Sequence, residues 1–150
     1  MAGDLVAARV VHILSAAIWV GGTVFLVAVA VPFARTFPPE RRTEIASAIG
    51  RRFRPLAWTA LGGLVASGLY TMQRLALFSS DRLTDSSYGR TLLVKLVLVA
   101  LLIVLAVVHD FVLGPRAERD HNGRGLLLTL ARINGVLTLV IPIIGVLLAH

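Results

Sequence analysis

Few side chains in this 150-residue sequence can do chemistry, and several of them lie inside long apolar stretches. His12 is within the first stretch, Lys95 is near the start of the third, and His109 is near the end of the third. An ionisable group at membrane depth costs roughly 2.5–3.5 kcal/mol to insert, so it is seldom retained without a partner. We therefore expect His12 to bind a metal ion or cofactor, or to react. The alternative is a hydrogen bond to a neighbouring helix, such as to Ser67.

The residues predicted to surround His12 come from three apolar stretches. Tyr70 and Met72 end the second stretch on the same side of the membrane as His12. Lys95 is the only lysine in the chain, and the alternative to a site role is that it snorkels to the membrane boundary. The candidate cofactor-binding residues are His12, Trp19, Gly22, Gly63, Tyr70, Met72 and Lys95, with His150 as a further candidate. The glycines either admit a flat cofactor or let helix backbones approach each other.

The candidate metal ligands are His12, His109 and Met72. At 1.5 Å rise per residue, His12 lies about 10 Å below the outer boundary and His109 about 27 Å below it. The two histidines therefore cannot bind one ion together. Haem b suits the set better than copper does, because an imidazole and a thioether are haem ligands. Copper(I) prefers thiolates and thioethers, and the chain has no cysteine and only two methionines.

Four apolar stretches must position these residues, at about 5–31, 55–78, 91–114 and 125–149. The sequence is 57% hydrophobic and only 15% charged, and each stretch is close to the ~20 residues that cross a bilayer. This predicts a single all-α domain, 1–150, that forms an integral membrane four-helix bundle. Residues 40–54 have apolar positions at helical spacing among arginines, which predicts a basic amphipathic helix on the cytoplasmic surface.

Charge and internal similarity predict how the bundle is built. Ten basic residues flank the spans on the side of the first and third loops and five on the other, which predicts a bacterial-type inner (plasma) membrane protein with both termini outside. A shift of 83 positions places Pro32 on Pro115 and His12 on Lys95, and residues 54–70 loosely match residues 132–150. The chain would then contain two parallel two-helix repeats.

Three short motifs carry a family resemblance. They are H-I-L-S-A-A-I-W-V-G-G (12–22), V-K-L-V-L-V (94–99) and H-D-F-V-L-G-P-R (109–116). Together they resemble the membrane domain of the copper resistance protein D (CopD) family. The His-x6-Trp-x-Gly spacing and the lysine that opens the third span also resemble HemJ-type protoporphyrinogen oxidases, a four-helix membrane family thought to bind haem b. That second resemblance implies a haem-ligand or catalytic role for His12 and a catalytic role for Lys95.

Four functions are compatible with these observations. The first is a CopD-like protein that binds haem b, or a metal, and transfers electrons or handles haem. The others are a HemJ-like oxidase, a copper transport or resistance protein, and an accessory subunit of a larger membrane complex. Whether the chain is an enzyme is open. The expected partners are the lipid bilayer and either other membrane or respiratory subunits or further copies of the chain, and nucleic acid is not expected.

Overall fold

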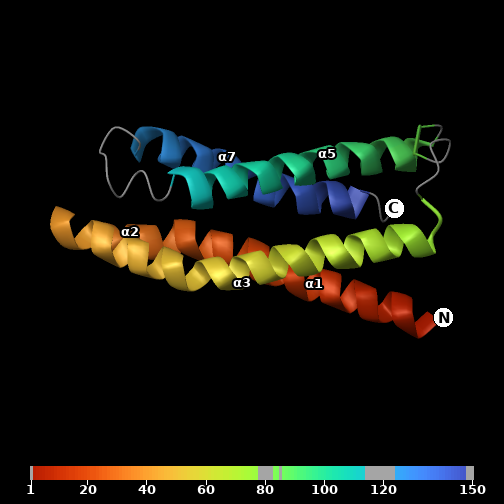
Figure 1. Ribbon diagram of the computed structural model, residues 1–150, viewed down its shortest axis with the longest axis horizontal. Coiled ribbons are helices and arrows are strands. Elements are labelled where there is room, and N and C mark those ends of the chain that lie inside the picture. Colours follow the sequence, from red (N-terminus) through yellow and green to blue (C-terminus); the bar gives the residue numbers. More distant parts are fainter. Residues whose placement is uncertain (1, 78–82, 85, 114–123, 148–150) are drawn as a thin grey trace. The chain divides into compact units, whose positions relative to one another are not determined.

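The computed structural model describes residues 2–77, 83, 84, 86–113 and 124–147 (Figure 1). Every regular element in these residues is helical, as predicted. The chain divides into two compact units, Met1–Phe78 and Ser79–His150. In each unit two long helices run antiparallel to each other as a hairpin.

The first unit contains two helical segments that are longer than a membrane crossing needs. Helix α1 spans Ala2–Phe25 and continues through the π-helical segment η1, Leu26–Ala30, into α2, Val31–Arg35. After a turn, α3 spans Pro39–Arg74 without interruption, with Pro55 inside it. The predicted surface helix 40–54 and the predicted span from residue 55 are therefore one continuous helix of 36 residues.

The second unit repeats this order in a shorter form. Helix α5 spans Ser87–Val107 and continues into the π-helical segment η2, Val108–Leu113, and α7 spans Arg124–Leu147. The start of α5 is fixed by Ser86, whose side-chain oxygen accepts a hydrogen bond of 2.9 Å from the Gly89 N–H. This N-cap satisfies one of the N–H groups that have no partner within the helix.

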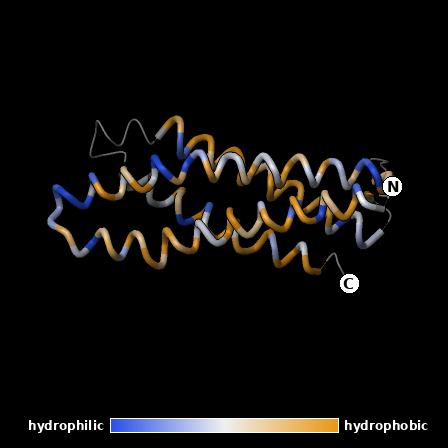
Figure 2. The backbone as a smooth tube through the Cα atoms, turned by 90° about the horizontal axis from the view of Figure 1, so that it is seen from below, coloured by the Kyte–Doolittle hydropathy of each residue, from blue (hydrophilic) through white to orange (hydrophobic). Residues whose placement is uncertain are grey.

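Three helical segments are long and apolar enough to cross a membrane, namely Gly3–Arg35, Ser87–Val112 and Thr129–Leu147. The apolar half of α3 is not among them, because its glycines, hydroxyl-bearing residues, Pro55 and Trp58 lower its mean hydropathy. Large apolar side chains cover the outside of these helices, including Ile13, Val97 and Leu147, which are each about two-thirds exposed. Figure 2 shows the apolar middle of the helices and the polar turn between α2 and α3. The chain is a multi-pass membrane protein.

Two pairs of adjacent glycines set the contact between α1 and α3. A Cβ atom on Gly22 would collide with the ring of Phe53, and one on Gly63 would collide with the hydroxyl of Ser15. Among the described residues, no side chain or other helix lies within 4 Å of that position at their neighbours Gly21 and Gly62. In each pair, therefore, the second glycine faces the partner helix. Close approach of this kind is how helices associate in lipid, where the hydrophobic effect does not drive them together.

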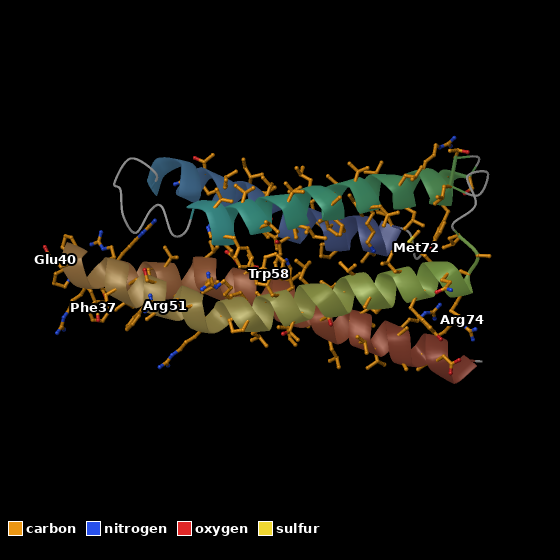
Figure 3. The ribbon with its side chains drawn as sticks, in the orientation of Figure 1. Phe37, Glu40, Arg51, Trp58, Met72 and Arg74 are labelled. Carbon is orange, nitrogen blue, oxygen red and sulfur yellow. The ribbon has the colours of Figure 1, made fainter. Side chains whose placement is uncertain are left out.

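An ion pair joins the ends of α1 and α3. The Arg74 guanidinium lies 3.2 Å from the Asp4 carboxylate, and it also lies 5.9 Å from the centre of the Tyr70 ring. Figure 3 labels Arg74 at this end of α3, and Glu40 and Phe37 at the other end of the hairpin. Both charged groups are substantially exposed, so the pair contributes little to stability.

The end of α3 predicts a stabilising substitution. Ala76 has a φ of 52°, in the left-handed region, and the Leu77 N–H donates to the Met72 carbonyl at 3.0 Å. This is a helix C-cap at which glycine is preferred, because a Cβ atom is strained there. We expect Ala76→Gly to raise the free energy of unfolding by about 1 kcal/mol. Thermal unfolding in detergent measures this, and an unchanged or lower melting temperature would contradict the assignment.

Candidate functional site

His12 is held by a hydrogen bond to the neighbouring helix. Its Nδ1 atom lies 2.9 Å from the Ser67 hydroxyl oxygen, and that hydroxyl lies 2.5 Å from the Gly63 carbonyl oxygen. A serine hydroxyl has one proton, and the Gly63 carbonyl can only accept it. Ser67 therefore accepts from His12, so Nδ1 carries a proton. In the neutral ring the lone pair is then on Nε2.

The imidazole ring is placed against a glycine. A Cβ atom on Gly68 would lie 3.6 Å from Cε1 of His12, so the ring packs against the α3 backbone. The hydrogen bond to Ser67 is the helix-to-helix contact that the sequence offered as the alternative to a site role. The two interpretations are compatible, because a metal-binding histidine almost always donates its other N–H to a fixed acceptor.

The other predicted residues of the first unit take different positions. Met72 is buried and lies one turn beyond Gly68, on the same face of α3. Trp19 is buried. The Tyr70 ring is partly exposed beside Arg74.

The predicted glycines Gly22 and Gly63 lie in the contact between α1 and α3. Phe53 and Ser15 fill the space beside them. This packing favours the interpretation of these glycines as close-contact residues over their use to admit a flat cofactor.

Lys95 lies on α5 in the second unit, and its side chain reaches α7. A Cβ atom on Gly145 would lie 3.3 Å from the Lys95 ammonium nitrogen. Within the described residues, this ammonium has no hydrogen bond or ion pair. Lys95 and His12 belong to different units, so their predicted grouping in one site stays a prediction.

His109 pairs with its neighbour in the sequence. Its Nδ1 atom lies 2.9 Å from a carboxylate oxygen of Asp110, in the π-helical segment η2, and both side chains are partly buried. Among the described residues, no three or more His, Cys, Asp or Glu side chains come together as metal ligands do. His150 lies outside the described residues.

Several contacts in these sites were not predicted from the sequence. The ion pair of Asp4 with Arg74 had a signal, since opposite charges lie at the adjoining ends of two successive spans. The contact of Gly145 with Lys95 had none, because a glycine within an apolar span gives no sign of the residue it faces. Ser67 was named in advance as a partner of His12, and the structure has that hydrogen bond.

The helices and their embedded polar groups define a multi-pass α-helical membrane protein with ionisable side chains inside its spans. Comparison with known proteins gives its family. The profile of the family described as copper resistance protein D matches residues 47–148, and the chain belongs to this CopD family. The match begins after His12 and includes Met72, Lys95 and His109.

One curated relative is similar over most of the chain. It is the copper transport protein CutJ of Bacillus subtilis (strain 168), 36% identical over 115 residues. These residues are 77% of this chain but 20% of the relative, so the chain spans about a fifth of the relative's length. No solved structure matches the chain. The comparisons confirm the CopD resemblance and support a copper-related membrane protein. They give no support to haem b as a cofactor, to electron transfer or to the HemJ resemblance.

Proposed function

We propose that this chain is a copper-handling membrane protein that binds copper(I) as its cargo through Nε2 of His12. The observation that carries the proposal is the hydrogen bond between His12 and Ser67, which orients the imidazole through Nδ1 and makes Nε2 the ring nitrogen that would bind the metal. The family and the name of the relative support copper as the cargo. The ligand types in the sequence favoured haem b over copper, and our proposal reverses that preference.

Met72 is the second ligand that we propose. The chain runs antiparallel in α1 and α3, with Asp4 opposite Arg74 and His12 opposite Ser67. In this register Met72 lies between the His12 level and the end of the hairpin, and its thioether is a soft donor that suits copper(I). A site with so few strong ligands binds weakly, and weak binding allows a cargo ion to be released.

The same proposal includes the setting of the protein. We infer a bacterial-type plasma membrane with both termini outside, from the excess of arginine beside the first and third loops. His12 would then be nearer the outer surface. The chain would receive or deliver copper there together with other membrane subunits.

Copper(I) titration of the purified protein tests the proposal. We expect the wild-type protein in detergent to bind one copper(I) per chain under reducing conditions, in competition with a chromogenic copper(I) ligand of comparably weak affinity. His12→Ala should lower the affinity at least tenfold, and His109→Ala should leave it unchanged because His109 lies on another helix. An absorption spectrum is recorded on the same samples. Copper binding that is equal in wild type and His12→Ala would contradict the proposal, as would a haem Soret band that disappears in His12→Ala.

A further inference from the structure

The two hairpins share a backbone irregularity at the same place. In the first, η1 ends at Ala30 and Pro32 follows two residues later; in the second, η2 ends at Leu113 and Pro115 has the same spacing in the sequence. Proline lacks the N–H that continues an α-helix, and before Pro32 the Val31 N–H donates to the more distant Leu26 carbonyl. A shared π-helical segment supports the internal repeat better than apolar similarity does.

The register between the helices is also the same in both hairpins. The repeat places His12 on Lys95, and the match of Arg54 with Arg132 places Ser67 on Gly145. The structure brings together the corresponding pairs in each unit. His12 contacts Ser67 across the first hairpin, and the Lys95 ammonium lies against Gly145 across the second.

The two hairpins differ in the residues at these corresponding positions, which are His12 and Ser67 in the first and Lys95 and Gly145 in the second. In the first hairpin an imidazole is oriented by a hydroxyl, as the imidazole of a metal ligand usually is. In the second, the hydroxyl-bearing residue is replaced by glycine, which leaves room for the end of a longer side chain carrying a positive charge. That charge has no ion-pair partner among the described residues. It is therefore a single positive charge inside the hairpin, as a bound monovalent cation would be.

Resting on the proposed copper function, we propose that the ammonium group of Lys95 replaces a copper(I) ion in the second hairpin. The chain then has two equivalent cation positions, of which the first binds copper and the second holds a covalently attached positive charge. An ammonium group has no lone pair for a metal and repels a second cation. Lys95 therefore limits the protein to one copper(I) ion per chain.

Rebuilding the imidazole and hydroxyl pair in the second hairpin tests this inference. We expect the double variant Lys95→His/Gly145→Ser to bind two copper(I) ions per chain, where the wild type binds one. The matched controls are Gly145→Ser, which keeps the ammonium, and Lys95→Ala, which supplies no ligand; both should bind one. The triple variant with His12→Ala should bind one ion, at the new position.

The outcomes separate this inference from the proposed function. A double variant that melts like the wild type and still binds one ion overturns the role of Lys95 and leaves copper binding by His12 intact. A wild type that binds no copper(I) overturns the proposed function itself. If the double variant does not fold, the reverse exchange His12→Lys/Ser67→Gly decides the matter. The variant His12→Lys/Ser67→Gly should bind no copper, and its melting temperature should equal or exceed that of His12→Ala/Ser67→Gly. A much lower melting temperature would contradict the equivalence of the two cation positions.

Discussion

Leucine in place of Gly63 is expected to destabilise the first hairpin by about 3 kcal/mol. A Cβ atom at this position already collides with the Ser15 hydroxyl, and the Ser15 Cβ and a methyl group of Val11 lie 3.4 and 3.9 Å from it. A leucine side chain therefore has no space unless α1 and α3 move apart. Separation would also remove the close contact on which helix association in lipid depends.

The adjacent glycine provides the matched control. Gly62, like Gly63, lies between a leucine and a glycine in the sequence, but no side chain or other helix of the described part of the chain lies within 4 Å of its Cβ position. We expect Gly62→Leu to be neutral or slightly stabilising, because leucine favours a helix over glycine by somewhat under 1 kcal/mol. Thermal unfolding in detergent, followed by tryptophan fluorescence, measures both variants. Equal melting temperatures for Gly63→Leu and Gly62→Leu would contradict the assignment of Gly63 to the contact between α1 and α3.

Alanine in place of Ser67 is expected to weaken copper(I) binding by about 10- to 100-fold. The hydroxyl accepts the Nδ1–H of His12 and thereby fixes both the tautomer and the direction of the ring. Without it the imidazole can rotate, and the proton can move to Nε2, the proposed ligand atom. The loss would come through His12, so Ser67 is a positioning residue and not a ligand.

A double-mutant cycle distinguishes this role from general damage. If Ser67 acts through His12, its removal should cost little further affinity in a protein that already has His12→Ala. Thr59→Ala is the control for hydroxyl loss on the same helix, since Thr59 is exposed and donates only to the Pro55 carbonyl. Equal and additive losses for Ser67→Ala with and without His12 would contradict the positioning role. Competition titration with a copper(I) chelator gives all four affinities.

The helices could be predicted from the sequence because their signal is local. Runs of apolar residues near the spanning length predicted four helices, and the structure has helices over all of them in the described residues. The lengths were less predictable. Residues 40–54 were expected to form a helix on the membrane surface that leads into the span from residue 55, and in the structure both belong to one helix, α3, with Pro55 inside it. The surface position of residues 40–54 stays a prediction.

The candidate site could be predicted only in part, because only some of its features have a local signal in the sequence. His12 was recognised because an ionisable group in an apolar span is costly, and Ser67 was a reasonable partner because hydroxyls there are few. The pairing of Lys95 with Gly145 had no counterpart in any local pattern. The internal repeat, by contrast, had already placed His12 and Lys95 in different two-helix units.

By itself, then, the sequence determined that this protein has membrane-spanning helices, that an imidazole and a single ammonium lie within them, and that it resembles the CopD family. Only the tertiary structure decided which glycine of each pair faces another helix, and which residues the imidazole and the ammonium meet. The reason is that lipid and the helix contact are both apolar environments. The hydrophobic pattern of a membrane helix therefore does not mark the face that packs, and that face is known only when the helices are placed together.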